Sequence, residues 1–445
     1  MRATLLAAAL LLLGSAACSR TADARKTGSL ASAPAAASPS APLRVGSSGD
    51  YPPFSVRASD GSWSGFDVAV AEAYARDRSR PLELVPFAWP DLERRLVAGD
   101  FDVAMSGVTV RGDRIALSPM TAAVARASAV LVVPASRDAR RAADRPGLTV
   151  AVNRGGHLER VARARLPRAK IVTVDDNRGL PAVLASGQVD GVVTDSLELQ
   201  SFTAHGEPEP RVALVLAEDR KAFWVAPGQD ALADDLDAWL ALREADGTLP
   251  RLRAQYFGAA GNARSLAGPD AAALRVADLV ARRLLLMPEV AAAKHAADLP
   301  IDAPAREEAV YARAREAALH DGLAPEPYAD LVRAQVEAAK VVQRAALARD
   351  AASPAGVNGE TPGDAAERAK ARLETQLRPA IDRIDAAIRA ALVAAAPLPT
   401  PVERLATALR ADAAVPGFDA EQARLLARAL ARIPAAVPWR SANSS

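Results

Sequence analysis

The stretch VARRLLLMPEVAAAKH, residues 280–295, carries a few cations, among them Arg283 and Lys294, on an otherwise largely apolar helical pattern rich in Ala and Leu. Arg283 and Lys294 stand eleven residues apart, about three turns of an α-helix, so their side chains are expected to point from one face. Fixed cations on a face that buries apolar residues cost free energy unless an anion neutralises them. The pattern therefore predicts an all-helical region with a pocket for an anionic ligand.

Three later motifs on predicted helices repeat this character: PIDAPARE (300–307) with Arg306 and Glu307, VEAAKVVQ (336–343) with Gln343, and LRPAID (377–382) with Arg378. In their order and spacing the four motifs resemble the all-helical chorismate mutases, most closely their secreted, periplasmic class. The resemblance covers roughly residues 265–440. Chorismate is a small dicarboxylate that rearranges to prephenate without covalent help from the enzyme. Such a site has to hold the reactive conformer and stabilise charge on the breaking ether.

The resemblance implies a contact for each of these polar residues. A planar guanidinium suits a carboxylate because it gives two parallel, charge-assisted hydrogen bonds, and a compact ammonium suits the ether oxygen. The implied contacts are Arg283 and Arg378 to the two carboxylates, Lys294 and Gln343 to the ether oxygen, and Arg306 with Glu307 to the ring hydroxyl.

Two positions depart from the family's pattern. Three residues before Arg306, where the family usually has Asp, this chain has Ala303, and Asp302 is expected to cap the helix that Pro304 helps to start. Four residues before the Gln, where Ser or Thr is common, it has Ala339. Both changes remove secondary contacts and keep the cations, so weaker binding at an intact site is expected.

Two alternatives stay open for the helical region. In one, the cations are ordinary residues of amphipathic helices, with charged ends in solvent. In the other, Ala303 and Ala339 mark a decayed mutase kept only for binding. Four neighbouring residues are expected on solvated faces, and His295 has no partner at metal-ligand spacing; the four are Glu289, His295, Glu308 and Lys340.

The segment from Leu43 to about Gly258 has a different sequence pattern. Short apolar, β-branched runs such as LRVGSS (43–48), LTVAVN (148–153) and VDGVVT (189–194) alternate with helical patterns. That alternation predicts an α/β domain with a mainly parallel sheet. LRVGSSGDYPPFS, GFDVAVAEAYA and the closing EADGTLPRLRAQYFG resemble the periplasmic solute-binding fold of the amino-acid type, in which two α/β lobes close over a ligand.

Most proteins of that fold are transport receptors, but a small group are cyclohexadienyl dehydratases, which convert prephenate or arogenate to phenylpyruvate or phenylalanine. The resemblance to this group rests on GDYPPFS (49–55), Trp89-Pro90, AMSG (104–107), VNRGG (152–156), Asn177 and TDSLE (194–198). It is closest at TDSLE, where Glu198 matches the proposed catalytic acid.

The dehydration needs an acid for the departing hydroxyl and cations that orient the side-chain carboxylate without stabilising the one that leaves. Glu198 is the candidate acid, with a pKa expected to be raised by desolvation in the cleft. Arg114, in VTVRGDR, matches the Arg that binds a ligand carboxylate throughout the fold. Further candidate contacts are Asp195, Lys221, Asn177 and Ser106, with Tyr51, Phe54 and Trp63 expected around the ring.

Each of these candidate residues also has an interpretation that gives it no role in catalysis. Glu198 could be an acid at a helix start, Asp195 holds the α-amino group in transport receptors, and Trp63 lies in a turn. His157 replaces the Thr of the family's glycine turn, either as a donor to a carboxylate or as a tolerated loop residue. SPMTAA (118–123) lacks the family's Tyr, so an amino-acid or aromatic-acid receptor joined to a mutase is the competing hypothesis.

The chain of 445 residues has a formal net charge of +2 with scattered Arg residues, which gives no argument for nucleic acid. Residues 1–18 read as an export signal, and Cys18, the only cysteine, follows small residues as at a lipoprotein processing site. A periplasmic protein, with or without a lipid tether at Cys18, is therefore expected. No later segment reaches the ~20 apolar residues of a membrane helix.

The expected organisation is a signal at 1–18, an Ala/Ser/Pro tether at 19–42, a two-lobed domain at 43–258, a linker at 259–269 and a helical domain at 270–440. No phosphate-binding Gly loop or metal motif is present in the sequence, and neither reaction requires a cofactor. The sequence thus predicts a bifunctional enzyme that makes prephenate and then dehydrates it; its oligomeric state is left open.

Overall fold

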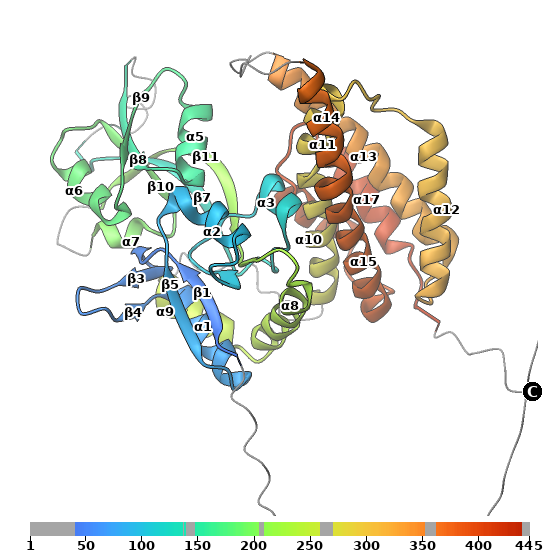
Figure 1. Cartoon of the computed structure of the whole chain (residues 1–445), viewed down its shortest axis with the longest axis horizontal. Helices are drawn as coiled ribbons and strands as arrows, with labels where there is room; N and C mark the ends of the chain where they lie inside the picture. The colour runs from blue at the N-terminus through green and yellow to red at the C-terminus, as the bar shows by residue number, and fades with distance from the viewer. Residues whose placement is uncertain are drawn as a thin grey trace, which may run out of the picture. The chain divides into compact units, whose positions relative to one another are not determined.

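The computed structural model describes residues 41–136, 138, 147–203, 209–258, 270–351 and 362–437 (Figure 1). The predicted export signal with Cys18, nearly all of the predicted tether and the predicted linker lie outside these ranges. In the described part of the chain, no helix combines the length and the apolar character needed to cross a membrane.

The first lobe forms around β1 (Leu43–Ser47), which is buried at four of its five positions because neighbours cover both of its faces. The sheet order is β12-β6-β1-β5, with β5 and β6 parallel to β1 and β12 antiparallel to β6. Its other elements are β5 (Leu82–Pro86), β6 (Val103–Ala104), β12 (Trp224–Val225), α1 (Phe66–Asp77), η1 (Trp89–Asp91), α2 (Leu92–Val97), α8 (Asp230–Ala245) and α9 (Thr248–Phe257). A small sheet, β2 (Asp50–Tyr51), β3 (Ser55–Arg57) and β4 (Trp63–Ser64), accompanies it.

The second lobe is a five-stranded sheet in the order β11-β7-β10-β8-β9. Strands β8, β9 and β10 run parallel to one another, but β7 is antiparallel to both β10 and β11, so the predicted mainly parallel sheet is in fact two mixed sheets. Its elements are β7 (Ala125–Val133), β8 (Thr149–Asn153), β9 (Lys170–Val174), β10 (Gly191–Asp195), β11 (Arg211–Lys221), α5 (His157–Arg165), η2 (Asn177–Gly179), α6 (Leu180–Ala185) and α7 (Leu199–Phe202).

The chain passes between the lobes twice, after β6 and after β11. The two passages hydrogen-bond to each other: the N–H of Val124 donates to the carbonyl of Lys221 at 2.7 Å, and Thr109 forms a bridge with Lys221. These crossings place Thr109 and Lys221 where both lobes meet, which is the position of a ligand site in a two-lobed fold.

The helical domain packs around α10 (Ala271–Leu285), which contacts α13, α15 and α16. Its other elements are α11 (Met287–Ala296), α12 (Pro304–His320), α13 (Pro325–Ala351), α14 (Pro362–Arg372), the π-turn η4 (Leu373–Leu377), α15 (Arg378–Ala395), α16 (Val402–Asp412) and α17 (Ala420–Ala431). The helix expected to carry both Arg283 and Lys294 is therefore divided, with Leu286 between two shorter helices and Pro288 in the first turn of the second.

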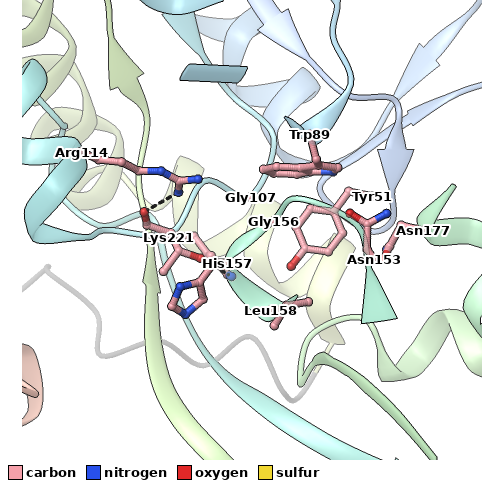
Figure 2. Close-up of a pocket in the computed structure, with 11 residues that line it drawn as sticks. Tyr51, Trp89, Gly107, Arg114, Asn153, Gly156, His157, Leu158, Asn177 and Lys221 are labelled. Atoms are coloured by element: carbon pink, nitrogen blue, oxygen red, sulfur yellow. Dashed lines mark hydrogen bonds between the residues drawn. The ribbon is translucent and has the colours of Figure 1, made fainter. Parts of the chain in front are cut away.

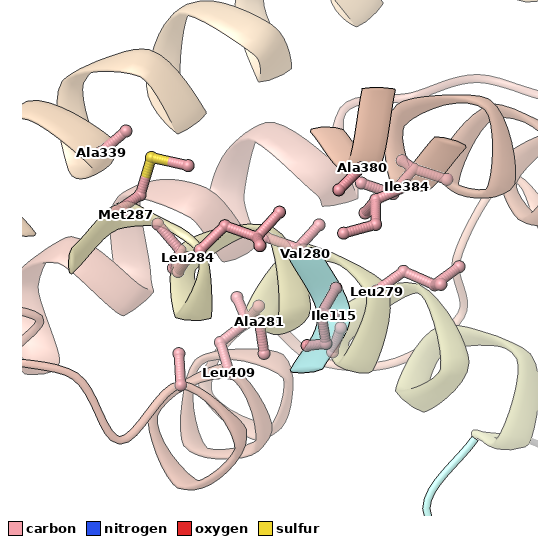
Figure 3. Close-up of a cluster of buried hydrophobic side chains, with 14 of the residues drawn as sticks. Ile115, Leu279, Val280, Ala281, Leu284, Met287, Ala339, Ala380, Ile384 and Leu409 are labelled. Atoms are coloured by element: carbon pink, nitrogen blue, oxygen red, sulfur yellow. The ribbon is translucent and has the colours of Figure 1, made fainter. Parts of the chain in front are cut away.

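Helix α3 (Gly112–Leu117) packs against the end of α10. Figure 3 shows Ile115 of α3 among Leu279, Val280 and Leu284 of α10, all in one buried apolar cluster. A Cβ added at Gly112 would lie 2.0 Å from the carbonyl oxygen of Leu285, so only glycine permits this backbone approach.

A buried ionic cluster joins β11 to α10. The carboxylate of Asp278 accepts hydrogen bonds from Arg220 and pairs with Arg282 at 2.6 Å, and all three residues are buried. Removing one partner from such a pair leaves an uncompensated charge in a region of low dielectric constant.

We expect Asp278→Asn to lower the free energy of unfolding of the full chain by about 3–5 kcal/mol, because two buried guanidinium groups lose their counter-ion. Urea unfolding followed by circular dichroism measures the change. The matched control is Asp330→Asn, whose partner Arg333 has a side chain 43% exposed, and which should change stability little. Equal midpoints for the two variants would contradict the prediction.

Candidate active sites

The helical domain contains a cavity of about 770 Å³. All six polar residues named from the motifs line it, so four motifs spread over about a hundred residues meet at one place. Among the described residues around this cavity, seven are cationic and four are carboxylates, which leaves an excess of positive charge suited to a dicarboxylate. The six are Arg283, Lys294, Arg306, Glu307, Gln343 and Arg378.

One nitrogen of the Arg283 guanidinium is bound to a carboxylate, and another has no partner in the described structure. Its Nε donates to Asp385 at 2.9 Å, while its buried Nη1 has no hydrogen-bond partner among the described residues. Burial raises the pKa of Asp385, although Arg283 opposes the shift. The guanidinium is thus oriented by Asp385 and keeps a donor for a ligand.

Lys294 has no carboxylate within ion-pair distance among the described residues, and its ammonium donates only to the carbonyl of Ile301, at 3.3 Å. Burial lowers the pKa of Lys294, and the like charges of Arg306 and Arg378 lower it further. An ammonium under this electrostatic strain is stabilised by a ligand that brings negative charge.

Gln343 is 4% exposed, and its Nε2 has only a weak contact with the sulfur of Met287 at 3.7 Å. Its Oε1 is buried without a partner in the described structure. Ala339, one turn earlier on α13, also lines the cavity and offers no hydroxyl. The amide is therefore free to donate to a ligand oxygen.

Glu307 anchors the start of α12. Its carboxylate accepts a hydrogen bond from the N–H of Ala303 at 3.1 Å and one from Lys340 at 3.0 Å. The expected cap at Asp302 is wrong: Ala303 is the N-cap residue, and Asp302 instead pairs with Arg344 at 2.6 Å. Glu307 reaches back to the N–H of the N-cap residue, much as the acid of a capping box does.

Lys340 was expected on a solvated face, and that expectation is wrong. Its side chain is 12% exposed, lines the cavity and pairs with Glu307 and Glu337. The hydrogen bonds to these two carboxylates hold the pKa of Lys340 above its usual range.

Arg378 begins α15 directly after the π-turn η4, a rare geometry that is common at functional sites. It pairs with Glu374, and its side chain remains 30% exposed. Arg306 is exposed in the described structure, so these two cations form the more accessible part of the wall.

A second, much smaller cavity of about 20 Å³ lies where the lobes meet. Figure 2 shows Arg114, Lys221 and His157 on one side of it and Tyr51, Trp89 and Asn177 on the other. The volume is room for about one water molecule. A ligand the size of prephenate is larger than this volume.

Glu198 is buried at 1% exposure and does not itself line this cavity, but it is hydrogen-bonded to the lining residue Asn177. Its carboxyl accepts hydrogen bonds from the hydroxyl of Thr194 at 2.5 Å and from the amide of Asn177, which lines the cavity. Burial, with a smaller contribution from Asp195, raises the pKa of Glu198 to about 8. The group is thus a neutral acid at pH 7, as a proton donor must be.

Lys221 joins two buried carboxylates. Its ammonium lies 2.7 Å from Asp195 and 3.7 Å from Asp219, and it donates to the hydroxyl of Thr109 at 2.9 Å. Burial alone would lower the pKa of Lys221, but Asp195 and Asp219 raise it above its usual value. The ammonium therefore stays charged and neutralises the carboxylate of Asp195.

Arg114 is 5% exposed, and no carboxylate lies within ion-pair distance of it in the described structure. It donates to the carbonyl of Thr109 at 2.8 Å and lies over the ring of Trp224. Burial lowers the pKa of Arg114 to about 9, and Arg111 contributes to the shift. A buried guanidinium without a counter-ion beside a cavity indicates an anion site.

His157 is the first residue of α5, and its Nε2 lies 2.9 Å from Asp219. The buried Nδ1 has no partner in the described part of the chain. Burial lowers the pKa of His157, against the pull of Asp219. The residue is thus built into the site wall and is not a loose loop residue.

Five predicted site residues fall outside the cavity lining. Two of them, Asp195 and Glu198, contact the lining residues Lys221 and Asn177. Of the other three, Phe54 is fully buried against Tyr51 and Phe257, Trp63 stacks with Arg57, and Ser106 hydrogen-bonds Ser48. The lining includes Trp89, which the sequence offered only as part of a family motif. The sequence analysis missed Asp219, which contacts the lining residues His157 and Lys221. Asp219 had a usable signal, since it stands two residues before Lys221 on one strand and so shares its face.

These features define a class: a two-lobed α/β ligand-binding domain with an anion site and a buried acid, followed by an all-helical domain with a cationic cavity. A family model for bacterial extracellular solute-binding proteins, family 3, matches residues 43–259, and one for chorismate mutase type II matches residues 270–344.

A cyclohexadienyl dehydratase of Pseudomonas aeruginosa is 35% identical over 224 residues, which are 48% of this chain and 82% of that protein. An ABC transporter arginine-binding protein of Escherichia coli is 26% identical over 51% of this chain and 96% of its own length. A solved ancestral amino-acid-binding protein, described as a precursor of cyclohexadienyl dehydratase, is 28% identical over 48% of this chain and 95% of its own, with a TM-score of 0.45.

The chain belongs to family 3 of the bacterial extracellular solute-binding proteins, and it joins a domain of that family, related to cyclohexadienyl dehydratase, to a chorismate mutase type II domain.

Proposed function

We propose that the chain catalyses two consecutive steps of aromatic amino acid biosynthesis. The helical domain rearranges chorismate to prephenate, and the two-lobed domain dehydrates prephenate or arogenate to phenylpyruvate or phenylalanine. The observation that carries the proposal is the buried acid Glu198, which is hydrogen-bonded to Asn177 of a cavity that the unpaired cation Arg114 also lines, on a chain whose other domain makes the matching substrate. Covalent linkage raises the local concentration of prephenate at the second site.

In the helical cavity, Arg283 and Arg378 bind the two carboxylates of chorismate. Asp385 orients Arg283, and the Nη1 without a partner supplies a donor. Lys294 and Gln343 donate to the ether oxygen as its bond lengthens, which stabilises the transition state more than the ground state. Arg306 and Glu307 hold the ring hydroxyl, with Lys340 fixing the carboxylate of Glu307.

In the two-lobed domain, Arg114 binds the side-chain carboxylate of the substrate. Glu198 protonates the departing ring hydroxyl, the C–O bond breaks to release water, and the ring carboxylate leaves as carbon dioxide with its electron pair completing the aromatic ring. Asn177 contacts both Glu198 and the cavity, so it positions the acid toward the substrate.

The competing function is an amino-acid receptor. In transport receptors of this fold, Asp195 holds the ligand's α-amino group; here the ammonium of Lys221 lies 2.7 Å from Asp195. This contact supports an enzyme over an amino-acid receptor, because the carboxylate already has its cation.

The test is a coupled assay on the full chain with chorismate as the only substrate. We expect loss of chorismate, transient prephenate and then phenylpyruvate. Accumulation of prephenate without an aromatic product would support the mutase assignment and overturn the dehydratase assignment. Calorimetry with amino acids, run in parallel, tests the receptor alternative. A receptor should bind an amino acid tightly and leave prephenate unconverted.

The acid role of Glu198 gives a pH dependence. The acid must be protonated, and its pKa is raised to about 8, so turnover at saturating prephenate should be level below that pH and fall tenfold per pH unit above it. Initial rates of phenylpyruvate formation from pH 6 to 10 measure this, with the uncatalysed rate subtracted. A rate that rises through pH 8 would indicate a general base instead.

We also propose that the protein acts in the periplasm, on the strength of residues 1–18 and of its solute-binding family, with Cys18 as a candidate lipid attachment site. Cys18→Ala should then move the protein from the membrane fraction to the soluble fraction. Recovery of the parent protein in the soluble fraction would support simple cleavage of the signal.

A further inference from the structure

The start of α5 brings together groups that the dehydration chemistry leaves unused. Gly156, His157 and Leu158 line the cavity between the lobes, together with Tyr51 and Arg114. The imidazole of His157 is fixed by the 2.9 Å contact between its Nε2 and Asp219 on β11.

The protonation of this imidazole follows from its partner. Burial alone would raise the pKa of Asp219, but Lys221 and His157 lower it below its usual range, so the carboxylate is ionised and can only accept. Nε2 must then carry the hydrogen. In a neutral imidazole the other nitrogen, Nδ1, is a bare lone pair, and it is buried without a partner in the described structure.

A bare lone pair in this wall is mismatched to the ligand that the site otherwise selects. Arg114 is buried without a counter-ion, so the cavity is prepared for a carboxylate. A carboxylate repels a neutral acceptor but binds strongly to an imidazolium N–H. The mismatch disappears if His157 takes up a proton when the anion arrives.

We propose that His157 binds the substrate's side-chain carboxylate as an imidazolium, taking a proton from solvent onto Nδ1 as the ligand enters, so that binding in the two-lobed site is linked to pH. The inference rests on the proposed dehydratase function and adds regulation to that site. Asp219 is the positioning residue, since it fixes the ring and shares the positive charge.

Groups from several elements act on this titration. Asp219 and Lys221 face His157 from β11, Arg111 precedes α3, and Asp195 of β10 is paired with Lys221. Lys221 and Arg111 oppose protonation of the empty site, and burial does so most strongly. A ligand carboxylate adds a second negative charge next to the ring, which favours the imidazolium.

The sign of the pH effect follows. The pKa of His157 is lowered in the empty site and raised by the bound anion, so between these two values the dissociation constant rises about tenfold per pH unit and about one proton is taken up per ligand. Above the higher value His157 stays neutral and binding is weakest. The second step of the chain would thus respond to the pH of its compartment.

Phenylpyruvate is a suitable probe because it carries the carboxylate and does not turn over. Calorimetry in two buffers with different ionisation enthalpies gives both the affinity and the number of protons taken up. The titrations are run on Glu198→Gln protein, so that Glu198 cannot contribute to the proton count. We expect net uptake there, and pH-independent binding without uptake in the double variant Glu198→Gln/His157→Gln.

A matched control replaces His320, which lies outside this site and has a side chain 83% exposed. Glu198→Gln/His320→Gln should take up as many protons as Glu198→Gln. Equal uptake with and without His157 would overturn the role of His157 while the site assignment stands. No phenylpyruvate binding by any variant would overturn the dehydratase assignment and this proposal with it.

Discussion

Lys294→Ala is expected to lower the turnover of chorismate by about a hundred- to a thousandfold. The ammonium has no carboxylate partner in the described structure, and in the proposed mechanism it donates to the ether oxygen on which charge develops. An interaction that strengthens in the transition state appears mainly in the turnover number. Stopped-flow or ultraviolet assays of chorismate loss measure the effect.

The matched control for Lys294 is Lys370→Ala, since Lys370 is exposed on α14 and does not line the cavity. It should leave turnover unchanged. Arg283→Ala should in addition raise the Michaelis constant, because its carboxylate contact already exists in the ground state. Near-normal turnover of Lys294→Ala would show that the ether oxygen is stabilised by another group.

Glu198→Gln is expected to lower the turnover of prephenate by about a hundred- to ten-thousandfold. Glutamine keeps the shape and can still contact Thr194 and Asn177, but it cannot deliver a proton to the leaving hydroxyl. Ligand binding should persist because Arg114 is untouched. Phenylpyruvate formation and calorimetry on the same protein separate the two effects.

Two controls accompany Glu198→Gln. Glu72→Gln, at an exposed position on α1, should behave as the parent protein. Chorismate mutase activity of Glu198→Gln should be unchanged, because none of the described residues lining the helical cavity comes from β10 or α7. A variant that still forms phenylpyruvate at the parent rate would reduce Glu198 to a structural acid, with His157 the next proton donor to test.

The motif residues of the helical cavity could be predicted because their spacing along a helix places them on one face and their motifs resemble those of a known family. Arg283, Lys294 and Gln343 each face the cavity, even though the helix expected over the first two is divided at Leu286. A bend of this kind depends on Pro288 and on the packing of α10 against its neighbours, and it does not change which face is buried.

The unpredicted contacts are pairings between distant segments. Asp219 reaches His157 across 62 positions of sequence, and Lys340 reaches Glu307 across 33. Asp302 does not cap α12, and its carboxylate instead pairs with Arg344, 42 positions away. In each case a charged group on another element supplied a partner that the local sequence does not show.

The sequence by itself indicated the two fold families and the identity of the chemical groups, because the motifs that resemble those families are local and can be recognised before the chain is folded. Only the tertiary structure decided the charge state of those groups. Glu198 becomes a neutral acid because it is buried beside Asp195, while Arg114 stays an unpaired buried cation because no carboxylate in the described structure lies within ion-pair distance of it. Burial and pairing depend on which segments pack together, and that is decided by the whole chain.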